Sequence, residues 1–240
     1  KNMHVFSSKR LTKIDIHGTG CVFSAAITAG LAKGISLLAA IQNAKKYIGE
    51  IILAAFTPGN GLPCVDPTTV IYKEREKLQA IFDLNNALEI FKKERIGNLI
   101  PEVQTNIGLG LSNATKHEDV LAIPGRIIKN GEDIFTGAQP QFGGSRHVAN
   151  IVLTVMQYDH EKRAVMNIKY TDTLLKICKK LKFKISSFDR AKEPKYIRAL
   201  EGSSLEWGTE KAIIRYGSVP DIIYDLGGIR KEEMIRVIAK

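Results

Sequence analysis

The sequence has little cysteine, few aromatic residues and no long apolar run. Its three cysteines, Cys21, Cys64 and Cys178, are far apart and form no CxxC pair. This pattern argues against a disulfide framework or a zinc site and favours reduced thiols in the cytoplasm. No apolar run approaches the ~20 residues that span a bilayer, and the opening KNMHVFSSKR lacks the apolar core of a signal peptide. We therefore expect a cytoplasmic protein that does not associate with a membrane.

Acidic residues are also scarce relative to basic ones, 25 against 35, which gives a net charge of +10. Such an excess predicts anionic partners, or else reflects the Lys- and Glu-rich surface found in thermophiles. The basic residues are spread along the chain, apart from short groups such as KICKKLKFK (176–184). There is no zinc-finger spacing and no RNA-binding aromatic motif, which disfavours nucleic acid and leaves phosphorylated small molecules as the expected partners.

The 240 residues, 44% of them hydrophobic and 25% charged, suit one large or two modest globular domains. Strand-like and helix-like segments alternate along the chain, which predicts an α/β fold. The Pro- and Gly-rich stretch TPGNGLPCVDPTT (57–69) marks a boundary. We expect one domain over residues 1–75, a connecting helix over 76–97 and a second domain over 98–240.

Hydrophobic periodicity and end signals place the main elements. Residues 21–33 are almost wholly apolar, which predicts a helix buried on all sides. A strand over 99–111 would put Glu102, Gln104 and Asn106 on one face. The other expected elements are a helix over 36–55 capped by Ser36, a helix over 73–95, a hairpin over 125–135 turning at Asn130-Gly131, helices over 145–159 and 171–183, strands over 184–190 and 220–227, and a helix over 209–217 capped by Thr209.

The first motif is HGTGCVFSAAITAG, which begins at His17. A strand end, a Gly-x-Gly turn and an apolar helix together favour an anion site, because the backbone N–H groups and the helix dipole converge there. Such glycines also serve simply to permit tight packing. The motif by itself leaves both interpretations open.

The longer string HGTGCVFSAAITAGLAKG (17–34) resembles the C-terminal signature of hydroxymethylpyrimidine phosphate kinases of the ribokinase superfamily. The resemblance implies that Gly18, Thr19 and Gly20 form an anion hole for the transferring phosphoryl group and that Cys21 takes the base position. Ile16 departs from the Thr usual in that family. The resemblance covers about the last quarter of such a kinase, so we expect a truncated, mainly helical fragment, inactive alone, with ATP used only by the kinase domain of the full-length protein.

A second set of candidates lies in predicted loops of the later domain. Arg126 stands at the entrance of the hairpin, and Ser145 stands at a helix N-cap with Arg146 and His147 in the first turn. Free N–H groups, the helix dipole and a guanidinium suit a phosphate or diphosphate. Alternatively, Ser145 only caps the helix, Arg146 is a surface charge, and His147 is structural rather than a proton donor.

Further polar residues stand where an α/β sheet usually binds ligands. Asp189 and Arg190 follow a strand, Ser203 and Ser204 precede a predicted helix, and Trp207 is the only Trp. Trp207 would stack on a ring or contribute to packing. Gln104 and Asn106 would line a pocket or belong to a solvated edge strand, and Asp221 and Asp225 would hold Mg²⁺ or cap turns.

The motifs LIPEVQTNIGLGLSNA, IPGRI, FGGSRHVANIVLTVM, MNIKY, SSFDR, EGSSLEWGTEKAI and PDIIYDLGGI together resemble the ThiN-type thiamine phosphate synthase domain over residues 98–240. Gly144 replaces an expected Ala. The resemblance implies a three-layer αβα sandwich of the class II aldolase type. It also implies condensation of hydroxymethylpyrimidine diphosphate with hydroxyethylthiazole phosphate to thiamine phosphate and pyrophosphate, with Mg²⁺.

On this reading Arg126 and His147 are catalytic, whereas the ligands of a metal are not indicated. The residues expected to bind substrate are Ser145, Arg146, Gln104, Asn106, Asp189, Arg190, Ser203 and Ser204. In this family the domain is commonly fused behind a hydroxymethylpyrimidine phosphate kinase, so two resemblances point to one pathway. The alternative is a thiamine phosphate sensor, which in related proteins follows a DNA-binding helix that this sequence lacks. A homo-oligomer is compatible with either function.

Overall fold

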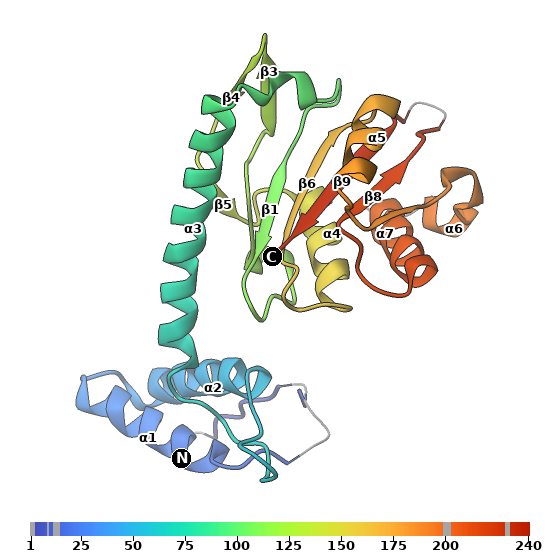
Figure 1. Cartoon of the computed structure of the whole chain (residues 1–240). Helices are drawn as coiled ribbons and strands as arrows, with labels where there is room; N and C mark the ends of the chain where they lie inside the picture. The colour runs from blue at the N-terminus through green and yellow to red at the C-terminus, as the bar shows by residue number, and fades with distance from the viewer. Residues whose placement is uncertain (1–2, 9, 12–14, 199–202, 229–230) are drawn as a thin grey trace. The chain divides into compact units, whose positions relative to one another are not determined.

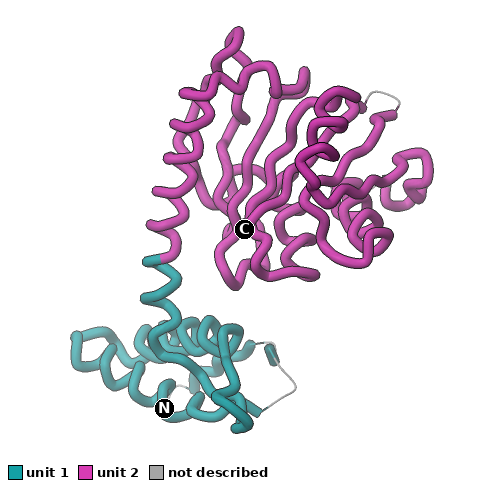
Figure 2. The backbone as a smooth tube through the Cα atoms, in the orientation of Figure 1, with its two compact units in different colours: residues 1–75 teal, residues 76–240 magenta. Residues whose placement is uncertain are grey.

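The computed structural model describes the chain except residues 1–2, 9, 12–14, 199–202 and 229–230. The described residues form two compact units, Lys1–Arg75 and Glu76–Lys240 (Figure 2). Helix α3 (Thr69–Lys93) begins in the first unit and continues in the second. Among the described residues, no helix combines the length and the apolar character that crossing a bilayer requires.

The first unit is built mainly from α1 (Thr19–Ala32) and α2 (Leu37–Leu53), which pack on each other. The Ser36 hydroxyl accepts a hydrogen bond from the Ala39 N–H at 3.5 Å, which confirms the predicted cap of α2. The segment before α1 pairs with the segment before α3, with the His17 N–H 2.8 Å from the Pro63 carbonyl oxygen. This pairing fixes where α1 begins.

Helix α1 differs from its prediction, because none of its residues is buried. Helix α2 packs so closely on it that a Cβ added at Gly30 would lie 3.0 Å from the Ala40 Cβ. The contact leaves much of the apolar surface of α1 exposed, including Leu31 at 45%. The expectation of a helix buried on all sides was therefore wrong for this unit.

The second unit contains a mixed sheet in the order β5-β2-β1-β6-β9-β8-β7, counted over the described residues. Strands β7 and β8 are parallel, and the other neighbouring pairs are antiparallel. The strands are β1 (Ile107–Gly110), β2 (Val120–Ala122), β5 (Gln141–Phe142), β6 (Ala164–Lys169), β7 (Ile185–Ser187), β8 (Ile222–Asp225) and β9 (Met234–Ala239). A separate hairpin of β3 (Ile127–Asn130) and β4 (Asp133–Thr136) confirms the predicted hairpin, but Asn130 pairs with Asp133, so the turn is at Gly131-Glu132, one residue later than predicted.

Helices cover both faces of this sheet (Figure 1). Helices α4 (Arg146–Met156) and α7 (Ser203–Tyr216) pack on one face, where Val120 and Ala122 of β2 point. The second-unit part of α3 and the helix α5 (Asp172–Lys180) pack on the other, where Leu121 points. Alternating strand residues thus bury both faces, as the α/β prediction requires.

One edge of the sheet collects the loops that carry most of the candidate residues. In this topology β2, β6, β7 and β8 end at that edge, and β1, β5 and β9 begin there. The loop after β2, the turn before β1 and the loop between β8 and β9 therefore lie along the same edge. Short elements complete the unit: η1 (Ile96–Leu99), η2 (His117–Asp119), η3 (Arg190–Lys192) and α6 (Lys195–Arg198).

Two predicted elements need correction. The strand over 99–111 is shortened to β1, because the chain turns at Glu102 and Val103 and Gln104 has φ 66°. Glu102, Gln104 and Asn106 therefore do not share a strand face. Helix α7 begins at Ser203, so Thr209 is a fully buried residue inside the helix and not its cap.

Candidate functional site

The start of α4 is set by a tight turn against β2. After β5 the chain passes through Gly143, which has φ 74°, and Gly144. A Cβ at Gly144 would lie 2.6 Å from the Ala122 carbonyl oxygen, so even Ala requires a backbone shift here. The glycine that departs from the family pattern thus brings α4 close to the end of β2.

The first turn of α4 has no side-chain cap. Ser145 occupies the N-cap position with φ −153° and ψ 113°, but its hydroxyl accepts no capping hydrogen bond. The predicted N-cap position is therefore confirmed, and the alternative in which Ser145 serves only as a side-chain cap is not supported. Arg146 and His147 are exposed in the same turn. The uncapped N–H groups carry the partial positive charge of the helix N-terminus, and this is the arrangement that binds phosphates.

Arg126 follows β2 in an unusual backbone conformation. Gly125 and Arg126 have φ 76° and 74°, and the left-handed region is strained for a residue with a side chain. The guanidinium is exposed, and its Nη1 donates to the Val103 carbonyl oxygen. The N–H groups of Glu102 and Val103 donate in turn to the Glu232 carboxylate, each at 3.0 Å. This turn thus joins the loop of Arg126 to the loop between β8 and β9.

The two predicted amide residues bond largely to the protein backbone. Asn106 is 6% exposed; its Nδ2 donates to the Ile123 carbonyl oxygen at 2.7 Å, and its Oδ1 accepts the Ile123 N–H at 3.0 Å. Gln104 Oε1 accepts the Lys129 N–H at 2.9 Å, and its Nε2 donates to the Glu102 carbonyl oxygen at 3.1 Å. These bonds hold the turn before β1 in place. A role in substrate binding stays a prediction for both.

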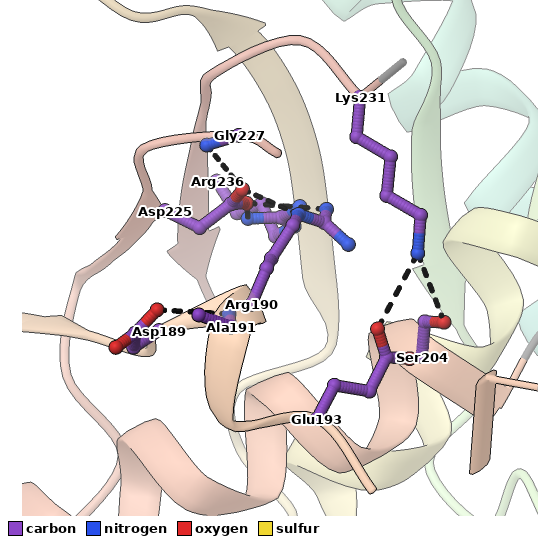
Figure 3. A network of polar contacts seen from close by, with 9 residues as sticks. All are labelled: Asp189, Arg190, Ala191, Glu193, Ser204, Asp225, Gly227, Lys231 and Arg236. Carbon is purple, nitrogen blue, oxygen red and sulfur yellow. Dashed lines mark hydrogen bonds and ion pairs between the residues drawn. The ribbon is translucent and has the colours of Figure 1, made fainter. Parts of the chain in front are cut away.

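A buried charge network lies at the ends of β7 and β8 (Figure 3). Arg190 donates to the Asp225 carboxylate from Nε at 2.5 Å and from Nη2 at 3.2 Å. Arg236 donates to the same carboxylate from Nη1 at 2.8 Å. Both guanidinium carbons lie over the Phe188 ring, 5.4 and 5.2 Å from its centroid. The predicted substrate residue Arg190 is therefore held rigidly at the sheet edge.

A second pair of charges adjoins this network. The Lys231 ammonium lies 3.4 Å from Glu193 Oε2 and 3.4 Å from the Ser204 hydroxyl (Figure 3). Burial raises the pKa of Glu193, but the Ser204 hydroxyl and the charges of Lys231 and Arg190 outweigh it and lower this pKa overall. Asp189 accepts the Ala191 N–H at 2.9 Å, which turns the chain after β7. The network therefore includes Arg190 and Ser204 of the predicted set.

A groove of about 970 Å³ lies beside these residues, lined by parts of α4, α6, α7 and the chain after β7. Asn150 and Thr154 line it from α4, three and seven positions after His147 and so on the same helix face. Trp207 lines it from α7 and packs edge-on against Phe188 at 6.2 Å between ring centroids. The groove also contacts Asp189 and Ser203. It offers aromatic surface between the later part of α4, the start of α7 and the end of β7.

The two aspartates considered for Mg²⁺ are engaged elsewhere. Asp225 is paired with two arginines, and Asp221 accepts from Lys162 Nζ at 2.8 Å and from the Lys184 N–H at 2.9 Å. Over the described residues, no group of three His, Cys, Asp or Glu side chains is arranged to hold a metal ion. The donor set therefore does not fit a protein-held Mg²⁺ site.

The first unit carries the other predicted site at the start of α1. Gly18 has φ 86°, and a Cβ there would meet Val65 Cγ2 at 3.3 Å. The Thr19 hydroxyl lies 3.4 Å from the Ile16 carbonyl oxygen, and α1 begins with no side-chain cap. Cys21 is an exposed free thiol, and Cys64 and Cys178 are also free. A turn at Gly18 thus precedes α1, whereas Thr19 and Gly20 already belong to the helix, and the anion hole stays a prediction.

Sequence reasoning missed Phe188, Glu193, Lys231 and Arg236. One signal was available for Arg236, which interrupts the otherwise apolar strand MIRVIA at a position that alternation places inside. Lys231 and Glu193 lie in loops, and their proximity depends on the fold.

Comparisons with known proteins identify relatives of both parts of the chain. Residues 83–240 match the family model described as thiamine-phosphate synthase ThiN, and residues 1–66 match the model described as phosphomethylpyrimidine kinase. The chain is 42% identical over 241 residues to the bifunctional thiamine biosynthesis protein ThiDN of Methanocaldococcus jannaschii. That match covers 100% of this chain and 54% of the relative. The chain thus spans about half the length of this relative.

Two further relatives match the second unit. The thiamine-phosphate synthase ThiN of Methanothermobacter thermautotrophicus is 37% identical over 159 residues, which are 66% of this chain and 84% of that protein. A crystal structure of the C-terminal domain of phosphomethylpyrimidine kinase superposes with a TM-score of 0.64 at 38% identity, covering 68% of this chain and 92% of that one. The chain therefore belongs to the thiamine-phosphate synthase ThiN family.

Proposed function

We propose that the second unit condenses hydroxymethylpyrimidine diphosphate with hydroxyethylthiazole phosphate to give thiamine phosphate and pyrophosphate. The observation that carries this proposal is the uncapped first turn of α4, with Arg146 and His147 exposed and the preceding Gly144 against the end of β2, which the loop of Arg126 follows. This arrangement suits a diphosphate, and Asn150 and Thr154 further along the same helix line a groove with aromatic walls. Family membership independently supports the same reaction.

The chemistry breaks one bond and forms one. The bond between the exocyclic pyrimidine carbon and the diphosphate oxygen breaks, and its electron pair leaves with pyrophosphate. The aminopyrimidine ring stabilises the cation that remains, and the thiazole nitrogen lone pair then forms the new C–N bond and makes a thiazolium. The main demand on the protein is to stabilise the charge that builds up on the departing diphosphate.

The residues of the site meet this demand in distinct ways. Arg126 and Arg146 would bind the diphosphate oxygens, and the uncapped N–H groups and hydroxyl at Ser145 would add hydrogen bonds. His147, in the same turn, would protonate the departing pyrophosphate or stabilise its charge. The strained backbone at Arg126 fixes the direction in which its guanidinium leaves the loop. Trp207, which packs edge-on against the buried Phe188, offers ring surface in the groove for stacking.

Several wider assignments belong to the same proposal. The layered sheet fits the class II aldolase type of sandwich, and the three free thiols fit the cytoplasm. Because the described carboxylates do not fit a protein-held Mg²⁺, no step above is assigned to that ion. The glycine turn at Gly18 would serve the kinase reaction of a longer protein, with ATP as phosphoryl donor and Cys21 as base.

The test is an assay of thiamine phosphate formation with both purified substrates. We expect His147→Ala to lower kcat by about 10²-fold or more, as loss of a general acid does. Arg126→Gly is the sharper arginine variant, because Gly tolerates φ 74° and the change removes the guanidinium without new strain. We expect a loss of about 10²–10³-fold, typical of a lost transition-state donor.

Exposed His160, beyond the end of α4, provides the matched control, and His160→Ala should keep the wild-type rate. Near-normal rates for both site variants would contradict the assignment. Tight binding of thiamine phosphate by the wild type without turnover would instead support the sensor function.

A further inference from the structure

We propose that Arg190 and Lys231 form a second anion subsite, which binds the phosphate monoester of the thiazole substrate. Asp225 acts as a positioning residue that holds Arg190 for this contact. The inference rests on the proposed synthase function and assigns one of its two substrates to residues outside α4.

The network carries more positive than negative charge. In the ion pairs of this network three cations, Arg190, Arg236 and Lys231, meet only two carboxylates, Asp225 and Glu193. The third carboxylate drawn in Figure 3, Asp189, is exposed and accepts the Ala191 N–H instead. The side chains of Arg190 and Arg236 are 10% and 3% exposed. An excess cation at such a poorly solvated place is unfavourable by itself and attracts an anion. A phosphate monoester supplies the missing negative charge.

The carboxylate of Asp225 is fully used within the protein. It accepts two hydrogen bonds from Arg190, one from Arg236 and one from the Gly227 N–H at 3.0 Å. The Arg190 Nη1 donates to no residue in the described part of the chain. Since Asp225 and the Phe188 ring together fix the plane of this guanidinium, Nη1 is a preorganised donor.

The loop after β8 brings Lys231 to the same place. Gly227 has φ 69°, and a Cβ there would lie 2.5 Å from the Lys231 carbonyl oxygen, so the turn requires Gly. Gly228 lies over Arg190, with its Cβ position 3.9 Å from the Arg190 Cβ, and exchanges two backbone hydrogen bonds of 2.9 Å with Lys231. The Lys231 side chain is 39% exposed, and its contacts at 3.4 Å are long. Its ammonium is therefore accessible to a ligand.

The monoester is the substrate group that suits this subsite. Arg126 and the start of α4 follow β2 and β5, whereas Arg190 and Lys231 follow β7 and β8. Four inter-strand steps of about 4.8 Å separate β2 from β8 in the sheet. The reaction brings together two anionic substrates whose rings meet between their phosphates. The groove with Trp207 is lined by Asp189 and Ser203, the sequence neighbours of Arg190 and of the Ser204 that Lys231 contacts, so rings bound there would place the second phosphate near Arg190 and Lys231.

The experiment measures the Michaelis constant of each substrate separately for Lys231→Gln and Arg190→Lys. Loss of a charge-assisted hydrogen bond predicts a rise of about tenfold or more in the KM for hydroxyethylthiazole phosphate. The KM for hydroxymethylpyrimidine diphosphate should stay at the wild-type value. The unphosphorylated thiazole alcohol provides a second acceptor for comparison. The ratio of kcat/KM for the phosphorylated acceptor to that for the alcohol should fall about tenfold in Lys231→Gln and in Asp225→Asn.

Lys92→Gln is the matched control, because Lys92 is an exposed lysine paired with Glu89 on α3. It should leave both KM values unchanged, and Lys231→Arg should restore most of the preference. Failure of the wild type to form thiamine phosphate would refute the proposed function itself. If the wild type is active and Lys231→Gln raises the KM of the diphosphate instead, or changes neither KM, the second subsite is refuted.

Discussion

Replacing Asp225 by Asn tests how much this buried carboxylate contributes to the stability of the second unit. Asp225 is 0% exposed and accepts hydrogen bonds from Arg190, Arg236 and Gly227. Burial is the main cause that lowers the pKa of Arg236, and the charge of Asp225 opposes it. In the Asn variant two guanidiniums share the buried space without an anion. The Asn NH₂ group also faces donors where the carboxylate accepted.

Removing one partner of a buried ion pair costs about 3–5 kcal/mol, because the remaining charge is left unpaired. Each kcal/mol lowers the Tm of a domain of 150–250 residues by about 2–4 °C. We therefore expect Asp225→Asn to lower the Tm of the second unit by roughly 6–20 °C. Thermal unfolding followed by circular dichroism, with urea unfolding for the free energy, measures this change.

A double variant separates charge from packing. Adding Arg236→Met to Asp225→Asn removes one of the two unpaired cations and should recover part of the lost stability. Arg236→Met alone leaves the pair of Arg190 and Asp225 and should cost less than Asp225→Asn. A loss below about 1 kcal/mol for Asp225→Asn, the range of an exposed ion pair, would refute the reasoning.

Three further predictions concern packing, pH and ligand binding. Gly208→Ala should lower the free energy of unfolding by about 1–3 kcal/mol, because the new Cβ would lie 2.5 Å from the Phe188 ring. Gly137→Ala is the control, because its Cβ would meet its nearest atom at 3.9 Å. Urea unfolding should show the control to be near neutral. Burial raises the pKa of Asp221, but hydrogen bonds from Lys162 and the Lys184 N–H outweigh it and lower the pKa. The stabilisation from Asp221 is therefore present above the unfolded pKa of about 3.9 and is lost as the pH falls through the lower folded pKa. Asp221→Asn should consequently be less stable than the wild type at neutral pH and should lose less stability on acidification. Equal losses of stability in the two proteins would contradict this prediction. Trp207 is the single Trp and lines the groove, so bound substrate should change the Trp fluorescence emission spectrum. An unchanged spectrum at saturating substrate would show that the substrate rings bind away from Trp207.

Local signals predicted several elements well. The hairpin over 125–135, the Ser36 cap and the helix that begins after Ser145 are confirmed, because each depends on residues adjacent in sequence. The hairpin turns one residue later than predicted, at Gly131-Glu132. The start of α7 was wrong because Thr209 has the residue type of a cap, while its true place is decided by packing against the sheet. Strands β2, β5, β6 and β9 were not predicted as elements. They are short or are interrupted by polar residues, so alternation was hard to recognise.

Some features of the candidate site were likewise predictable from the sequence, whereas others depend on the tertiary fold. The sequence by itself determined the α/β class, the family and the presence of Arg126, Arg146 and His147 in loops and helix starts. The tertiary structure alone brought Arg190, Asp225 and Arg236 together. Arg190 follows β7, Asp225 ends β8 and Arg236 lies in β9, and these strands are neighbours in the sheet. It also decided that Asp225 holds arginines and not a metal, because buried charge is stabilised by the partners that the fold places beside it.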